Sequence, residues 1–324
     1  MGDNGYYIKK AKQVLLEVKK TVIGKDEVLC KIMMAILAKG HILIEDIPGV
    51  GKTTMATAFA QVLNLKYNRI QFTPDVMPSD IVGFNMYNKA TNSFEYRDGA
   101  AMCNILLADE INRTSPKTQS ALLQVMEEGA VTVDGSIKKL PDPFVVLATQ
   151  NHLGSVGTQK LPDSQLDRFM IKISMGYPTI SDEINIMKSK QTIQEHLNKI
   201  VSYEDFLGMR EAANKVYVHD AVYDYVARLA DATRNSKEIL QGMSPRASIA
   251  LIAMSKAEAF LRGREYVIPS DIQYILCDVI GHRIVINKGI RRTNITETSV
   301  VKSIIENVAV PTIAMSEKSD SLMW

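Results

Sequence analysis

A short glycine-rich segment constrains this chain more than any other feature. The apolar residues Ile42, Leu43 and Ile44 have the character of a buried strand, and the segment 46–54 follows them almost directly. A turn of this composition exposes backbone N–H groups, and a helix that begins near Lys52 adds the positive end of its dipole. The sequence therefore predicts a phosphate-binding loop between a strand and a helix of an α/β fold.

The loop carries the groups that a bound nucleoside triphosphate needs. We expect Lys52 to reach the outer phosphates and the Thr53 hydroxyl to ligate Mg²⁺. The backbone of the turn is expected to contact the remaining phosphate oxygens. The predicted phosphate-binding residues are Pro48, Gly49, Val50, Gly51, Lys52, Thr53 and Thr54.

One position departs from the strict phosphate-loop pattern, which has glycine where this chain has Asp46. Aspartate is among the few non-glycine residues that tolerate a left-handed backbone and can cap a turn. We therefore interpret Asp46 as a substitute for that glycine, because Gly49, Gly51 and Lys52 remain in place.

A second apolar run, residues 105–108, ends in the carboxylates of Asp109 and Glu110. Asp109 is expected to hold Mg²⁺ together with Thr53, and Glu110 to polarise the attacking water. The two motifs occur in this order, and each follows a strand-like run. Together they predict hydrolysis of a nucleoside triphosphate.

Two further residues have an open interpretation at this point. Asn151 follows the strand-like run 144–149, where it could orient the attacking water or merely cap the strand end. Beside the two motifs above, the water-orienting role is the better interpretation. Arg168 precedes the strand-like run 170–174 and could stabilise a phosphoryl group bound by a neighbouring subunit or pair with Asp167. Spacing alone does not decide between these two roles.

Arg246 lies in the first turn of a predicted helix, after the N-cap Ser244 and Pro245. A cation in the first turn opposes the helix dipole, so local stability does not favour it. We therefore expect Arg246 to contact a nucleotide phosphate from the helical part of the chain.

Strand-like and helical stretches alternate up to about residue 178, which predicts a parallel sheet flanked by helices. Two insertions interrupt this plan, at 73–100 and at 131–140, and the second turns at Asp134 and Gly135 as a hairpin. Residues 179–324 show helical periodicity instead, and predict an all-α lid subdomain. The expected strands are 41–45, 69–72, 104–108 and 144–149, and the expected lid helices are 182–196, 203–216, 219–234, 245–262, 269–281 and 296–307.

Composition excludes several classes of protein. Among 324 residues, 38 are basic and 36 acidic, so the net charge of +2 gives no general attraction to nucleic acid or anionic membrane. No apolar run is long enough to span a membrane. The three cysteines have neither metal-ligand nor disulfide spacing, which suits a reducing compartment, and we expect a cytoplasmic protein.

These segments together resemble the MoxR family of AAA+ ATPases over nearly the whole chain. The stretches that carry the resemblance are Val22–Lys25, Gly40–Glu45, Gln71–Asp75, Pro78–Ile81, Leu107–Arg113, Pro116–Leu123, Ala148–Asn151, Leu166–Phe169, Ser244–Ala247 and Val279–Ile284. Two stretches depart from the usual family sequence, at 97–100 and at 152–157.

The resemblance implies an ATP- and Mg²⁺-dependent motor that assembles as a ring, a hexamer, with nucleotide at subunit junctions. It implies adenine contacts from Val22, Ile23 and Gly24, with Asn151 as sensor 1, Arg168 as arginine finger and Arg246 as sensor 2. Residues 73–100 would then be the helix-2 insert, and 131–140 the pre-sensor hairpin, at a pore that engages client protein. Family partners often carry von Willebrand factor A domains.

Three other functions compete with a protein-remodelling motor. A DNA-dependent motor is disfavoured by the balanced charge, including that of the 73–100 insertion. A magnesium-chelatase-like motor subunit would require a partner chelatase subunit. A scaffold that binds nucleotide without hydrolysing it is disfavoured by the intact pair Asp109 and Glu110. The C-terminal Leu322, Met323 and Trp324 remain unexplained.

Overall fold

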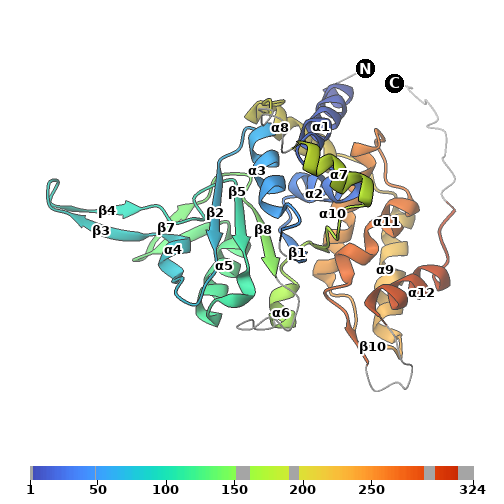
Figure 1. The fold of residues 1–324 in the computed structure, drawn as a ribbon. Coiled ribbons are helices and arrows are strands. Elements are labelled where there is room, and N and C mark those ends of the chain that lie inside the picture. The colour runs from blue at the N-terminus through green and yellow to red at the C-terminus, as the bar shows by residue number, and fades with distance from the viewer. Residues whose placement is uncertain (1–2, 48, 151–160, 190–196, 288–295, 313–324) are drawn as a thin grey trace, which may run out of the picture.

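The computed structural model describes residues 3–47, 49–150, 161–189, 197–287 and 296–312. Pro48, Asn151, the departure at 152–157 and the C-terminal Leu322–Trp324 lie outside these ranges. Figure 1 shows a sheet-containing body with two hairpins on one side and a group of helices on the other.

The centre of the body is a five-stranded parallel sheet with the order β2-β5-β8-β1-β9. All five strands lie within or next to the runs that the sequence predicted, and the predicted α/β class is confirmed. The strands are β1 (Ile42–Glu45), β2 (Tyr67–Gln71), β5 (Ile105–Asp109), β8 (Val145–Gln150) and β9 (Ile171–Ile173).

Alternating side chains of these strands enter two separate cores, as the period of a strand requires. Leu43, Leu106 and Val146 pack on one face with α5 (Pro116–Glu128). Ile42 and Ile105 pack on the other face with the remaining helices of the body and with the lid. The helices on this second face begin with α1 (Asp3–Lys19), α2 (Asp26–Leu37) and α3 (Lys52–Val62).

Both insertions form β-hairpins. The first contains α4 (Pro78–Val82), β3 (Phe84–Asn88) and β4 (Ser93–Arg97), and the second contains β6 (Ala130–Val133) and β7 (Ser136–Lys139). Asp134 (φ 48°) and Gly135 (φ 79°) give the second hairpin the left-handed two-residue turn that its sequence predicted.

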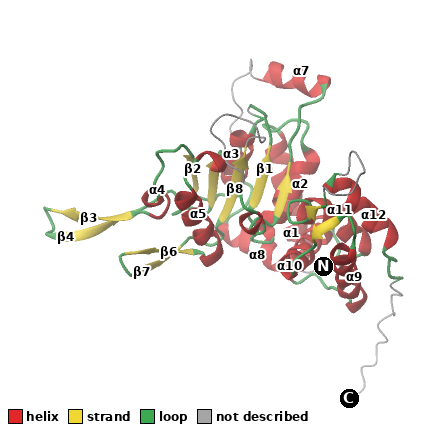
Figure 2. Cartoon of the chain, turned by 90° about the horizontal axis from the view of Figure 1, so that it is seen from below, coloured by secondary structure: helices red, strands yellow, loops and turns green. Residues whose placement is uncertain are grey.

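The two hairpins lie side by side and project from the same side of the sheet (Figures 1 and 2). The Asn85 side-chain amide donates to the Asp134 carboxylate at 2.7 Å, and the Lys138 ammonium lies 4.5 Å from the centre of the Tyr96 ring. These contacts fix the hairpins as a pair.

The predicted helical lid is confirmed, with one addition. A small two-stranded sheet of β10 (Ile239–Gln241) and β11 (Val285–Ile286) joins two of its segments. The lid helices are α7 (Ile180–Ser189), α8 (Tyr203–Asn214), α9 (Asp220–Asn235), α10 (Pro245–Leu261), α11 (Pro269–Ile280) and α12 (Glu297–Asn307). Because α1 and α2 pack on α8 and α10 in one continuous core, the boundary near residue 178 stays a prediction.

Candidate functional site

The carboxyl ends of the parallel strands form one edge of the sheet, which we call the carboxyl edge. The phosphate loop leaves β1 there, and Asp109 and Glu110 stand at the end of β5. Because β8 lies between β1 and β5, the loop and the two carboxylates flank the end of the same strand. Ligands of open α/β sheets bind outside this edge.

The phosphate loop has the backbone that its glycines predict. Gly49 (φ 85°) and Gly51 (φ 93°) are left-handed, and Gly51 is the residue that precedes α3. A Cβ atom would meet no other atom at either position, so the backbone conformation itself accounts for glycine. The buried Lys52 ammonium donates to the Ile47 carbonyl at 3.2 Å and lies along the loop.

Asp46 has a different role from the one predicted. Its backbone is not left-handed, since Lys39, Asn64, Asn92, Glu110 and Asp134 are the described non-glycine residues with positive φ. Its buried carboxylate instead accepts backbone N–H groups from Ile47 (2.9 Å), Met175 (2.5 Å) and Gly176 (3.0 Å). The left-handed backbone expected at this position is therefore wrong, and the tolerance of the loop for aspartate stays a prediction. Asp46 ties the start of the loop to the segment that follows β9.

The two carboxylates share one buried hydroxyl. Thr149, fully buried in β8, donates to Asp109 Oδ1 at 2.6 Å and accepts the backbone N–H of Glu110 at 2.9 Å. Glu110 has a left-handed backbone (φ 59°), which turns the chain sharply after β5. A single hydroxyl therefore fixes the orientation of both residues.

Each carboxylate also pairs with an arginine. Arg69 of β2 donates to Asp109 Oδ2 at 2.8 Å, and Arg113 donates to Glu110 Oε2 at 2.8 Å. These arginines place positive charge beside the two adjacent carboxylates. The donor set of the edge suits Mg²⁺, since hydroxyl and carboxylate oxygens are its preferred ligands and Thr53 and Asp109 supply them.

The segment predicted to contact adenine lies beside the same edge. Lys25 donates through Nζ to the carbonyl groups of Met175 (2.6 Å), Gly176 (3.1 Å) and Tyr177 (2.9 Å). The N–H groups of Met175 and Gly176 bind Asp46. Gly24 (φ 71°) lies against Asp182 so closely that a Cβ atom would overlap its carboxylate. Val22, Ile23 and Gly24 are thereby held next to the start of the phosphate loop.

Arg168 and Arg246 lie at the opposite edge of the sheet, where the strands begin; we call it the amino edge. The Met170 N–H donates to the His41 carbonyl at 2.7 Å, which places the residues before β9 level with the start of β1. The four residues of β1 separate the two edges by about 13 Å. Neither arginine therefore lies with the phosphate loop of its own chain.

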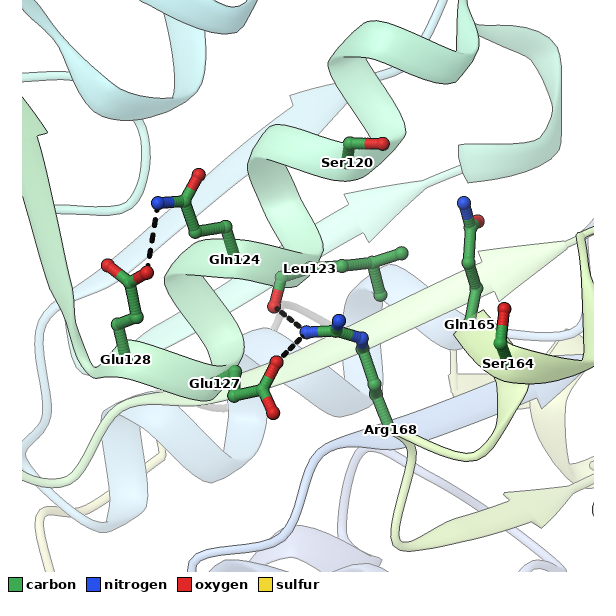
Figure 3. A pocket seen from close by; sticks show the side chains of 8 residues that line it. All are labelled: Ser120, Leu123, Gln124, Glu127, Glu128, Ser164, Gln165 and Arg168. Carbon is green, nitrogen blue, oxygen red and sulfur yellow. Dashed lines mark hydrogen bonds and ion pairs between the residues drawn. The ribbon is translucent and has the colours of Figure 1, made fainter.

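The two arginines meet at one carboxylate. Arg168 donates through Nη1 to the Leu123 carbonyl at 3.2 Å and to Glu127 Oε2, and Arg246 donates to Glu127 Oε1 at 2.9 Å. Figure 3 shows Arg168 reaching the last turn of α5. The pocket at this place, between α5 and α6 (Asp163–Leu166), has a volume of about 440 Å³.

The segment that carries Arg168 is held from behind by two buried residues. Arg283 pairs with Asp167 at 2.9 Å and donates to the Phe169 carbonyl at 2.8 Å, while its side chain is only 2% exposed. The His282 ring bonds the same Phe169 carbonyl at 2.9 Å. Burial lowers the pKa of His282 to about 3, so the ring is neutral.

A second histidine fixes α5 to the sheet. His41 accepts the Val146 N–H through Nδ1 at 3.0 Å, so its other nitrogen carries the proton and donates to the Met126 carbonyl at 3.0 Å. Desolvation lowers the pKa of His41 to about 4, and the ring is neutral. The residue after Met126 is Glu127, so this contact also fixes the carboxylate between the arginines.

The structure thus brings most predicted residues to two places. Gly49, Val50, Gly51, Lys52, Thr53, Thr54, Asp109 and Glu110 are at the carboxyl edge with Val22–Gly24, while Arg168 and Arg246 share the amino edge. Pro48 and Asn151 are outside the described residues. Sequence analysis missed Thr149, Arg69 and Glu127, although Thr149 lies in a run that it assigned to a strand end.

Comparison with known proteins agrees with the fold. Residues 41–171 match the ATPase family associated with various cellular activities (AAA), and residues 231–304 match the AAA lid domain. The fold and the site therefore define a AAA+ ATPase.

Full-length relatives specify the family. The chain is 38% identical over 310 residues to Chaperone MoxR1 of Mycobacterium tuberculosis, covering 93% of this chain and 82% of the relative. It is 44% identical over 296 residues to the uncharacterised YeaC of Bacillus subtilis, covering 91% and 92%. A crystal structure from Cytophaga hutchinsonii, of a protein described as a candidate ATPase, matches with a TM-score of 0.90 and 37% identity over 96% of this chain and 97% of that one. The chain belongs to the MoxR family of AAA+ ATPases, and it hydrolyses ATP.

Within the described ranges, no helix combines the length and the apolar character that crossing a membrane requires.

Proposed function

We propose that this ATPase works as a ring in which each nucleotide lies between two subunits, and that the ring remodels partner proteins. The observation that carries this proposal is the separation of Arg168 and Arg246 from the phosphate loop of their own chain. A ring that joins unlike edges brings the amino edge of one subunit to the carboxyl edge of the next.

In the proposed reaction the carboxyl edge holds the nucleotide and the metal. Lys52 and the loop N–H groups bind phosphate, Thr53 and Asp109 hold Mg²⁺, and Glu110 accepts a proton from the attacking water. Bound Mg²⁺ neutralises charge on the phosphate oxygens. The adenine contacts of Val22, Ile23 and Gly24 and the water-orienting role of Asn151 are part of the same proposal.

The amino edge of the neighbouring subunit completes the site. We assign Arg168 as the arginine finger, because a guanidinium beside the transferred phosphoryl group stabilises the charge of its transition state. Arg246 is the second cation of that edge. It binds a phosphate of the nucleotide that the neighbouring subunit holds, not of the nucleotide at the phosphate loop of its own chain. A cyclic hexamer is the assembly we expect.

The paired hairpins are the proposed contact with a partner protein. Phe94 is 72% exposed and Tyr87 is 47% exposed, and their rings stack edge to face at 5.4 Å on the projecting hairpin. Exposed aromatic side chains of this kind bind protein surfaces. We propose that they engage a client or a von Willebrand factor A domain partner in the cytoplasm, in keeping with the chaperone name of the MoxR1 relative.

Two linked measurements test the shared site. The first is the rate of ATP hydrolysis per subunit against protein concentration, with mass followed by light scattering. The proposal expects the rate to rise with assembly. A rate that is independent of concentration in a monomer contradicts it.

The second measurement uses complementation. Lys52→Ala disables the carboxyl edge and Arg168→Ala disables the amino edge, so each variant alone is expected to be inactive. When the two are co-expressed in one ring, some junctions combine two intact edges and activity returns. If the mixed rings assemble but still do not hydrolyse ATP, the site is not shared between subunits.

A further inference from the structure

Glu127 is the one carboxylate that both arginines of the amino edge contact in the described structure. Arg168 and Arg246 come from distant parts of the chain, one before β9 and the other at the start of α10. Their guanidinium groups carry the same charge, so they repel each other unless an anion lies between them. Glu127 Oε2 accepts a hydrogen bond from Arg168, and Oε1 accepts one from Arg246. Figure 3 shows the contact with Arg168.

The position of residue 127 in its helix does not explain why a glutamate occupies it. The residue lies in the last turn of α5, where the negative end of the helix dipole disfavours a carboxylate. Arg246 lies in the first turn of α10, where the positive end disfavours a cation. Each residue is unfavourable for its own helix and favourable for the other, so the contact between them accounts for both.

The contact leaves the arginines able to bind a further anion. Arg168 uses Nη1 for both Glu127 and the Leu123 carbonyl, and a guanidinium also carries N–H groups on Nε and Nη2. The Arg168 and Arg246 side chains are 31% and 48% exposed, so a phosphate of a neighbouring subunit can reach their guanidinium groups.

We infer that Glu127 is a positioning residue that holds Arg168 and Arg246 together as one phosphate-binding unit for the neighbouring subunit. This inference rests on the proposed function, because it assumes that both arginines act across a junction. The Glu127 carboxylate accepts from the two guanidinium groups, and its proposed role is to act on the nucleotide only through them. It sets where the two guanidinium groups stand before the junction forms.

The test compares Glu127→Ala with Glu128→Ala in the assembled ring. Glu128 is the matched control, because it belongs to the same helix end and its carboxylate binds Gln124 of the same helix at 2.9 Å. We expect kcat to fall about tenfold in Glu127→Ala, with the KM for ATP changed less than about twofold, since the neighbour's loop binds the nucleotide. Glu128→Ala should match the unmodified protein.

Glu127→Gln should fall between these two, because its amide oxygen still accepts from one guanidinium. Thermal unfolding of Glu127→Ala and Glu128→Ala should agree, since both residues are exposed. A loss of activity confined to a variant that also unfolds early would assign Glu127 to stability and overturn the inference.

A double-mutant cycle separates positioning from an independent effect. In the Arg246→Ala background, Glu127→Ala should cause a much smaller further loss of kcat, because the pair that Glu127 holds no longer exists. If the two losses multiply instead, Glu127 acts independently and the inference is wrong.

The inference and the proposed function fail in different ways. If Arg168→Ala and Arg246→Ala both hydrolyse ATP like the unmodified protein, the shared site itself is absent. If both lose activity while Glu127→Ala equals Glu128→Ala, the shared site stands and only the positioning role of Glu127 falls.

Discussion

The two edges of the central sheet are built from opposite chemistry. The carboxyl edge gathers Asp46, Asp109 and Glu110, whose carboxylates are fixed by backbone N–H groups, arginines and the Thr149 hydroxyl. The amino edge presents Arg168 and Arg246 and is supported from behind by the neutral rings of His41 and His282. One edge is therefore rich in carboxylates, and the other presents two guanidinium groups.

Under the proposed function, this difference means that each chain carries two half-sites that it cannot join by itself. The strands that separate them are short, and both half-sites are fixed by contacts to the same sheet. A substitution at one edge is therefore expected to weaken that edge without displacing the other.

The largest expected effect comes from Glu110→Gln. We expect kcat to fall about a thousandfold, because the amide cannot accept a proton from water, while ATP binding persists through the intact loop. Single-turnover hydrolysis and calorimetric ATP binding measure the two properties. Turnover close to that of the unmodified protein would show that Glu110 is not the general base.

Next in size is Asp46→Gly, which restores the glycine of the strict phosphate-loop pattern. We expect the free energy of unfolding to fall by about 3 kcal/mol, because three backbone N–H groups lose a charged acceptor. Urea unfolding followed by circular dichroism measures the change. An unchanged or more stable variant would mean that these bonds do not hold the carboxyl edge.

The amino edge should respond to acid through its histidines. His282 has a native pKa of about 3, whereas an unfolded histidine has a pKa of about 6.5. The unfolded state therefore takes up the proton first, and the stability contributed by this ring is lost as the pH falls from 6.5 towards 3.

His282→Asn has no such proton to take up, and its amide can still donate to the Phe169 carbonyl. Between pH 7.5 and 5.0 we expect it to lose about 2 kcal/mol less unfolding free energy than the unmodified protein. Urea unfolding at the two pH values measures this. Equal losses in both proteins would contradict a neutral His282.

The smallest effect is expected from Thr149→Val, with Thr149→Ser as the control that keeps the hydroxyl. Losing the shared hydroxyl frees both Asp109 and the Glu110 backbone, and we expect kcat to fall about tenfold with a higher Mg²⁺ requirement. Hydrolysis against Mg²⁺ concentration measures it. If valine and serine behave alike, the hydroxyl does not orient the carboxylates.

What the sequence predicted correctly is what local chemistry decides. Apolar runs predicted buried strands, and Asp134 with Gly135 predicted a two-residue hairpin turn. These features depend on residues that are close in the sequence, so they can be predicted without knowledge of the fold.

What it could not predict depends on contacts between distant segments. From the sequence, Asp46 is only a loop residue, because its bonds to Met175 and Gly176 depend on the fold. Glu127 is likewise only a charged residue of a helix, because the two arginines that it binds come from distant segments. The placement of Arg246 away from the loop of its own chain follows from how α10 packs, not from its own turn.

The hairpin pair gives an assembly of such chains a polarity. A junction between unlike edges repeats by rotation about one axis, without the two-fold axes that would invert a subunit. Every copy then carries its paired β3–β4 and β6–β7 hairpins in the same orientation. The resulting particle has two unlike faces, and the hairpins of every copy bear the same relation to them.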